Sequence, residues 1–143
     1  MDYRNYAKSL LGKKRNLDAA YSSINAEVAS LEQERCSLKT ALGSSNSFER
    51  ETIKRRIVDT LARIEDCRLR RSIVERQLSL ISRGMNSLDD YQKDLLEVFF
   101  IDKTPSCEQD VAEKFARERA QLHRDKCRAL EQFTLSVYGV LKL

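Results

Sequence analysis

The sequence predicts an all-α protein: a long antiparallel two-helix coiled-coil hairpin, residues 1–84, followed by a small three-helix helix-turn-helix module, residues 85–143. Four Gly and one Pro among 143 residues are too few for a protein with many strands and tight turns. Apolar residues recur every seven positions through the first part of the chain, as in coiled coils. Helix-start signals then divide the second part into short segments.

The first arm of the hairpin is predicted over residues 3–42, where one apolar position recurs in steps of seven. These positions are Tyr3, Leu10, Leu17, Ile24, Leu31 and Leu38. After a break at residues 43–47, a second seam follows at Ile53, Thr60, Cys67, Val74 and Ile81. Asn46 and Glu49, three residues apart, form a capping pair that predicts where the second arm begins.

The two seams fit an antiparallel pair, in which facing residues have numbers with a constant sum. Ile24 with Cys67 and Leu31 with Thr60 both sum to 91. Arg71 then lies opposite Tyr21, so we expect a cation–π contact between them.

A second apolar stripe follows the outer side of the second arm. Its members are Ala62, Leu69, Ile73 and Leu80. Two interpretations are open: the stripe covers the C-terminal module of the same chain, or it is a self-association surface that makes the protein a homodimer.

Charge and composition exclude several classes of protein. The net charge is +4, with +6 in residues 1–84, −2 in residues 85–143 and a local +3 over residues 117–128. No apolar run approaches the ~20 residues that cross a bilayer, and no signal peptide is evident, so we expect a soluble cytoplasmic protein without a membrane partner. Four Cys without a C-x-x-C spacing and a single His predict no metal site and no cofactor, and the Cys residues are interpreted as buried free thiols.

The C-terminal module is predicted to begin with Ser87 as an N-cap, and its first helix to end near Ile101. Ser106 and Gln109 form a capping pair for a second, short helix. The last helix should end at Gly139, a residue that favours the left-handed C-cap conformation.

The last helix has two contrasting sides at 100° per residue. One side carries Leu122, Ala129, Leu130 and Phe133, and the other carries basic and amide side chains. In helix-turn-helix proteins that bind double-stranded DNA, Arg and Gln on the second of two helices contact the bases. The predicted DNA-binding residues are Arg117, Arg119, Gln121, Arg124 and Arg128, with Lys103 and Thr104 contacting the DNA backbone.

Several segments also resemble a known family. They are Asp89–Leu96, Asp110–Phe115, Leu122–Phe133 and Tyr138-Gly139, and the most specific are Val111-Ala112-Glu113-Lys114 and Arg128-Ala129-Leu130-Glu131. The C-terminal module resembles region 4 of bacterial sigma factors, and most closely the small phage-encoded transcriptional regulators of the RinA and ArpU type. The resemblance implies sequence-specific DNA binding that controls phage or prophage genes in a bacterial host. It implies no enzyme activity.

Two residues depart from the usual pattern of such a turn. Ala116 stands where Gly or Asn is common, and Glu118 stands where Ser or Thr usually caps the second helix. We therefore expect a less favourable turn and a weaker helix cap.

An alternative hypothesis is a coiled-coil adaptor that contacts RNA polymerase or a phage assembly partner. An enzyme is not expected, since no Gly-rich phosphate loop or H-E-x-x-H motif is present and His123 has no nucleophile placed beside it by spacing.

Overall fold

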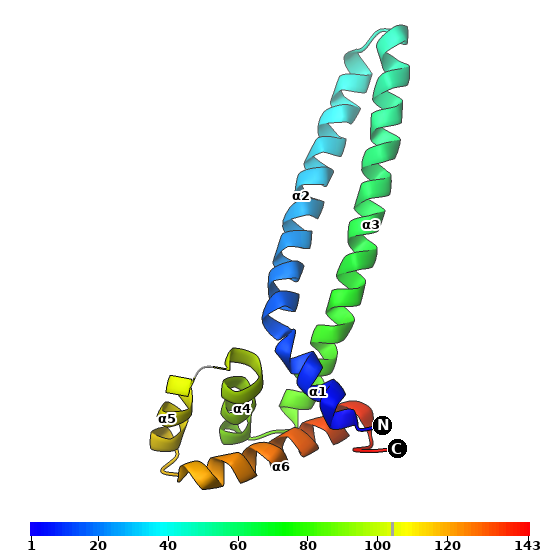
Figure 1. The fold of residues 1–143 in the computed structure, drawn as a ribbon. Coiled ribbons are helices and arrows are strands. Elements are labelled where there is room, and N and C mark those ends of the chain that lie inside the picture. The colour runs from blue at the N-terminus through cyan, green and yellow to red at the C-terminus, as the bar shows by residue number, and fades with distance from the viewer. Residues whose placement is uncertain (104) are drawn as a thin grey trace. The chain divides into compact units, whose positions relative to one another are not determined.

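The structure is a computed structural model that describes residues 1–103 and 105–143, without the side chains of residues 105–107. Within that part of the chain the protein is all-α, 87% helical, with six α-helices and no strand (Figure 1). None of the helices described there is both long and apolar enough to cross a membrane. The predicted all-α fold class is confirmed.

The chain divides into two compact units. The two-helix unit contains residues 19–75, and the terminal unit contains residues 1–18 and 76–143. This division differs from the predicted domains, 1–84 and 85–143, because helix α1 packs against helix α6 and so joins the C-terminal helices.

The two-helix unit is built from the middle parts of α2 (Lys14–Ser44) and α3 (Ser47–Asn86). Within this unit the two helices run side by side in opposite directions (Figure 1). The Asn46 side chain accepts a hydrogen bond from the Glu49 backbone N–H at 2.9 Å. The predicted start of this helix is therefore confirmed, and its capping residue satisfies a backbone donor that the first turn of a helix leaves free.

The core of the two-helix unit is a narrow seam. Ile24, Leu31, Ile64 and Cys67 form a buried cluster, and Ile24, Leu31 and Cys67 are positions of the two predicted seams. The contact that Arg71 makes differs from the predicted one. Instead of stacking on Tyr21, its guanidinium donates to the Asn25 side chain at 3.1 Å, because a directed hydrogen bond is within reach on the same helix face.

The terminal unit begins with α1 (Tyr3–Gly12), and here the prediction of one helix over residues 3–42 is wrong. The chain turns at Lys13, directly after Gly12, before α2 begins. Ala7, Leu10 and Leu11 are buried, and α1 contacts α6. The heptad pattern continues through the break because each helix still needs an apolar face, whatever it packs against.

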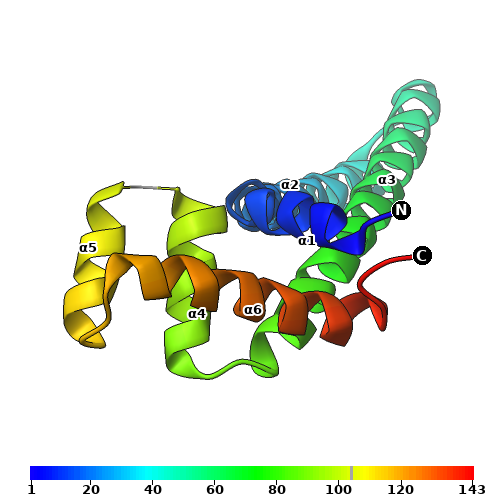
Figure 2. The same cartoon turned by 60° about the horizontal axis from the view of Figure 1, so that its bottom comes forward.

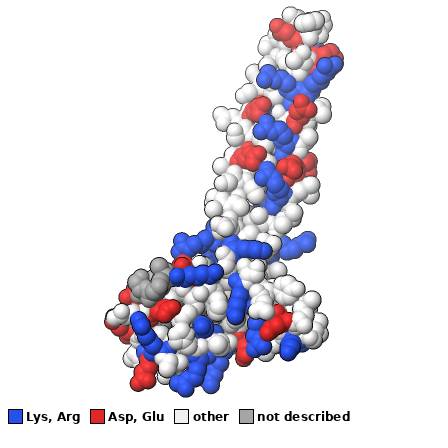
Figure 3. All heavy atoms as spheres, in the orientation of Figure 1, with Lys and Arg blue, Asp and Glu red and all other residues white. Residues whose placement is uncertain are grey.

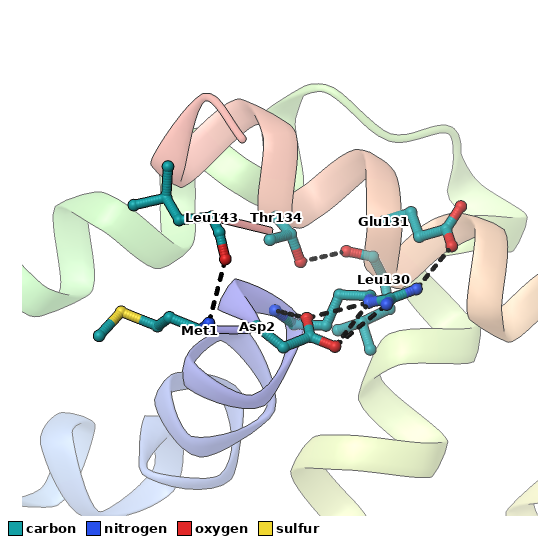
Figure 4. A network of polar contacts seen from close by, with 7 residues as sticks. Met1, Asp2, Leu130, Glu131, Thr134 and Leu143 are labelled. Carbon is teal, nitrogen blue, oxygen red and sulfur yellow. Dashed lines mark hydrogen bonds and ion pairs between the residues drawn. The ribbon is translucent and has the colours of Figure 1, made fainter. Parts of the chain in front are cut away.

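Backbone pairing joins the two ends of the chain in the terminal unit (Figure 4). The Met1 amino group donates to the Leu143 carbonyl at 3.2 Å, and the Leu143 N–H donates to the Met1 carbonyl at 3.0 Å. Arg4 bridges Asp2 and Glu131, with N–O distances of 3.0 and 3.2 Å. These contacts attach the start of α1 to α6.

Helix α4 (Asp90–Leu96) continues into η1, a π-helical turn at Glu97–Asp102. Its N-cap is Asp89 and not Ser87 as predicted. Asp89 forms a capping box with Gln92, whereas the Ser87 hydroxyl donates to the Gly84 carbonyl at 2.7 Å and so closes the preceding helix. A carboxylate is a strong acceptor for free N–H groups at a helix start.

Helix α5 (Pro105–Lys114) and helix α6 (Arg119–Tyr138) complete the terminal unit. Figure 2 shows α6 crossing α4, with α1 alongside α6, and α6 contacts both of these helices. Gly139 has a φ of 78°, so the predicted left-handed C-cap is confirmed. Since α5 begins at Pro105, Ser106 lies inside the helix and is not its cap; the side chain of Ser106 lies outside the described residues.

Gly84 allows α3 and α6 to approach closely within the terminal unit. A Cβ atom at this position would lie 2.4 Å from ring atoms of Phe133 and 2.9 Å from Val137. Phe133 is itself fully buried. The glycine is therefore needed for packing and not for an unusual backbone angle.

Candidate nucleic-acid interface

A small apolar core fixes the positions of α4, η1, α5 and α6. Leu95 and Val98 come from α4 and η1, Val111 from α5 and Leu122 from α6, and all four are buried. As predicted, Ala129, Leu130 and Phe133 are also buried on the same side of α6. The opposite side of α6 is therefore directed away from the core.

The connection between α5 and α6 is short and strained at one residue. Ala116 has a φ of 52°, in the left-handed region that costs a non-glycine residue roughly 1–2 kcal/mol. The Arg117 N–H donates to the Ala112 carbonyl at 2.9 Å and closes the turn. Glu118 is the N-cap of α6 and makes no capping hydrogen bond through its side chain. Both departures noted in the sequence have the expected structural effect.

The arginines of this region are exposed. Arg117, Arg119, Arg124 and Arg128 are solvent-accessible, and Gln121 is half-buried. Within the part of the chain that the structure describes, none of these four guanidinium groups forms an ion pair. Figure 3 shows Lys and Arg side chains gathered along α6 at the lower edge of the view. These residues supply positive charge that the protein does not neutralise internally.

The exposed arginines do not all share one face. Arg124 and Arg128 are one helical turn apart and project to the same side of α6. Arg119, five residues before Arg124, projects about 140° away from it at 100° per residue.

Tyr91 links Arg117 to the body of the module, a role that the sequence interpretation missed. The Arg117 guanidinium lies 5.4 Å from the centre of the Tyr91 ring. The Tyr91 hydroxyl donates to the Asp125 carboxylate at 2.7 Å. Burial and this hydrogen bond raise the pKa of Tyr91 to about 12, so the hydroxyl stays protonated and continues to donate at neutral pH. No local sequence signal gives this link, because it joins residues of different helices.

Lys103 lies apart from the arginines. It is exposed, has a φ of 52° and follows η1, at the opposite end of α5 from the turn. Ten residues of helix separate the two ends, roughly 15 Å. Thr104, the other residue predicted to contact the DNA backbone, lies outside the described residues.

The cysteines and the histidine that the structure describes are not grouped into a metal site. No group of three or more His, Cys, Asp or Glu there could hold a metal ion. Cys67 is buried as predicted, but Cys36 and Cys127 are exposed, because both lie on helix sides that face away from a core. His123 packs its ring against Phe99 with centroids 5.3 Å apart.

The apolar stripe predicted on α3 falls in both units. In the two-helix unit Ala62, Leu69 and Ile73 are exposed, the latter two at 66% and 62%. Val58, one turn before Ala62, is exposed at 63%. Leu80 belongs to the terminal unit and is half-buried.

Comparison of the chain with models of protein families, with curated proteins and with solved structures gave no significant match.

Proposed function

We propose that the protein is a sequence-specific DNA-binding transcriptional regulator and that α5, the turn and α6 act as a helix-turn-helix. One observation carries the proposal: in the described part of the chain, exposed arginines without ion pairs lie along the second helix of a pair joined by a short turn, with Arg124 on its outward side. A basic ridge on that helix is the electrostatic footprint expected of a DNA-binding module.

The chemistry of these side chains suits the major groove. An arginine donates two hydrogen bonds to guanine O6 and N7, and a glutamine pairs with adenine N6 and N7. Arg124 projects to the solvent side of α6, where a helix lying in the groove would meet base edges, and Arg128, one turn later, projects about 40° from it. Arg119 is more suited to a neighbouring phosphate, since it projects in another direction.

The finer architecture is part of the same proposal. We treat the paired parts of α2 and α3, residues 19–75, as an antiparallel coiled coil and residues 85–143 as a helix-turn-helix module with three helices. The buried cluster of Ile24, Leu31, Ile64 and Cys67 supports a coiled-coil seam. The shared core of α4, α5 and α6 supports the module.

The biological setting follows from the sequence resemblance alone. Similarity to sigma region 4 and to RinA- and ArpU-type regulators favours control of phage or prophage genes in the bacterial cytoplasm, with RNA polymerase as a further partner. In this role the protein needs no cofactor and performs no catalysis.

Selection of duplexes from a random-sequence DNA library by the full chain tests the proposal. The selected duplex should bind at least 10³ times more tightly than a scrambled duplex of equal length, the lower end of the usual ratio for specific binding. Arg124→Ala should cost about 1–3 kcal/mol of binding free energy and relax selectivity at one base pair. Arg63→Ala is the matched control, since Arg63 is an exposed arginine of the two-helix unit.

Two results would reject the proposal. One is an affinity for every duplex of only about 10⁻⁴–10⁻⁶ M, the salt-sensitive background of a basic protein. The other is unchanged, selective binding by an Arg124→Ala, Arg128→Ala double variant.

The exposed side chains of α3 favour a second candidate, an adaptor that associates through Ala62, Leu69 and Ile73, with Leu80 on the same helix. Exposed apolar side chains at such spacing are typical of helix–helix interfaces. Under this hypothesis Leu69→Glu with Ile73→Glu converts a dimer or a complex into a monomer in sedimentation equilibrium. Wild-type protein that is already monomeric at high concentration, and that captures no RNA polymerase, would contradict it.

A further inference from the structure

A surface pocket of about 280 Å³ lies between the start of α4 and α6, beside the outward side of α6. Its walls come from both helices and from the turn before α6. Its lining includes Asp89, Tyr91, Arg117, Gln121, Asp125 and Arg128.

Both carboxylates of the pocket already have donors. Asp89 accepts a hydrogen bond from the Gln92 backbone N–H at 2.8 Å, and Asp125 accepts one from the Tyr91 hydroxyl at 2.7 Å. Neither Arg117 nor Arg128 forms an ion pair with any residue that the structure describes. The two carboxylates keep further lone pairs, and within the described part of the chain the two guanidinium groups and the Gln121 amide beside them have donors without a protein acceptor. These groups fit an anion with several acceptor oxygens.

Arg117 is held in place before any ligand arrives. Its guanidinium lies over the Tyr91 ring at 5.4 Å, and that ring is fixed by Phe115 at 5.0 Å and by the hydrogen bond to Asp125. A stacked guanidinium keeps the N–H groups at its edge free to donate. Less side-chain entropy is then lost on binding.

The pocket lies on the flank of α6 and not on its outermost side. Its α6 residues, Gln121, Asp125 and Arg128, form the stripe toward α4, whereas Arg124 does not line the pocket. When a recognition helix lies in the major groove, its outer side meets base edges while its flanks and the preceding helix meet the DNA backbone.

We propose that this pocket receives one phosphate group of the DNA backbone, bound by Arg117, Gln121 and Arg128, and that Tyr91 with Asp125 acts as a positioning pair for Arg117. This inference rests on the proposed function and deepens it. It assigns Arg117 to a sequence-independent contact and leaves base reading to Arg124.

The test measures the affinity of the full chain for a selected and a scrambled duplex over a series of salt concentrations. Arg117→Ala should lower the affinity for both duplexes by the same factor. It should also reduce the slope of log K against log salt by about 0.9, the value for one lost phosphate contact. Tyr91→Leu removes the ring on which Arg117 stacks, and should lower the affinity for both duplexes with little change in selectivity. Tyr91→Phe keeps the ring but loses the hydrogen bond to Asp125, and should have a smaller effect in the same direction.

Three controls keep the result interpretable. Arg63→Ala removes one charge from the two-helix unit and should leave the slope unchanged. Arg117→Lys keeps the charge but cannot stack as a planar group, so it should retain the slope and lose affinity. Thermal melting of each variant checks that it folds. If Tyr91→Leu does not fold, Arg117→Ala still tests the phosphate site, because Arg117 is exposed.

The outcomes separate this inference from the proposed function. Selective wild-type binding with an unchanged salt slope in Arg117→Ala would overturn the phosphate site and leave the proposed function standing. Altered selectivity at one base pair in that variant would overturn it as well, because Arg117 would then read a base. A folded Tyr91→Leu variant with wild-type affinity would overturn the positioning role. Absence of selective binding by the wild type would overturn both.

Discussion

Arg68 and Arg70 of the two-helix unit differ from the arginines around α6 in what surrounds them. In the two-helix unit, Arg68 pairs with Glu32 at 3.4 Å and Glu65 at 2.9 Å, and Arg70 pairs with Glu27 at 3.1 Å. This unit has ten Lys and Arg and nine Asp and Glu, a net charge of +1. Around α6, within the described part of the chain, the four arginines form no ion pairs.

The difference shows that the number of basic residues does not locate the charge available to a partner. The net charges, +6 for residues 1–84 and −2 for residues 85–143, do not distinguish paired arginines from unpaired ones. The two-helix unit has a narrow seam and joins its helices with ion pairs. The terminal unit has a broader core, including the fully buried Phe133 and Leu95, and does not need its α6 arginines for packing.

Removing part of the terminal core should have the largest effect on stability. Phe133→Ala should lower the free energy of unfolding by about 3–5 kcal/mol, because it deletes a fully buried ring. Leu135→Ala, two residues along the same helix and 47% exposed, should change it by less than about 0.5 kcal/mol. Chemical denaturation measures both, and equal losses would contradict the proposed importance of this core.

A methyl group added to a glycine should have opposite effects in the two units. Gly84→Ala should cost about 1–3 kcal/mol, since its Cβ would lie 2.4 Å from the Phe133 ring. Gly43→Ala, which meets no atom within 4 Å, should gain roughly 0.5–1 kcal/mol through helix propensity. Thermal denaturation compares the two variants, and a stable Gly84→Ala protein would show that the helices can separate without cost.

The turn before α6 should become more stable when its strained residue is relieved. Ala116→Gly should gain about 1 kcal/mol, because glycine adopts a φ of 52° freely. Ala120→Gly, four residues later inside α6, should instead lose about 0.5–1 kcal/mol. Urea denaturation of both variants tests the sign, and destabilisation by Ala116→Gly would mean that the turn is not under strain.

The smallest effects on stability should distinguish an ion-paired arginine of the two-helix unit, Arg68, from Arg124 on α6. Arg68→Ala should lose about 0.2–1 kcal/mol of stability at low salt, and less at high salt, because it removes a surface ion pair. Arg124→Ala should leave stability within about 0.5 kcal/mol at either salt concentration. A loss in Arg124→Ala as large as that in Arg68→Ala would remove the contrast between the units.

Local signals in the sequence predicted the local structure well. The cap at Asn46, the left-handed Gly139 and the burial of Leu122 and Phe133 depend on neighbours within one or two helical turns. The unusual Ala116 was also evident from the sequence, since a turn of this length needs one left-handed residue.

Contacts between distant segments could not be predicted in the same way. A heptad pattern gives the apolar face of α1 but not its partner, which is α6. The support that Tyr91 gives to Arg117 depends on how α4 crosses α6. The choice of Asp89 over Ser87 as the N-cap depends on where the preceding helix ends.

The joining of the chain's two ends has a consequence for synthesis on the ribosome. Arg4 and its partner Glu131 are 127 positions apart, so α1 is made long before the helix that covers it. At about 5–20 residues per second, that interval lasts roughly 6–25 seconds. The two-helix unit can pair during this time, while Leu10 and Leu11 are still without α6. During this interval α1 presents an apolar face to which a chaperone can bind.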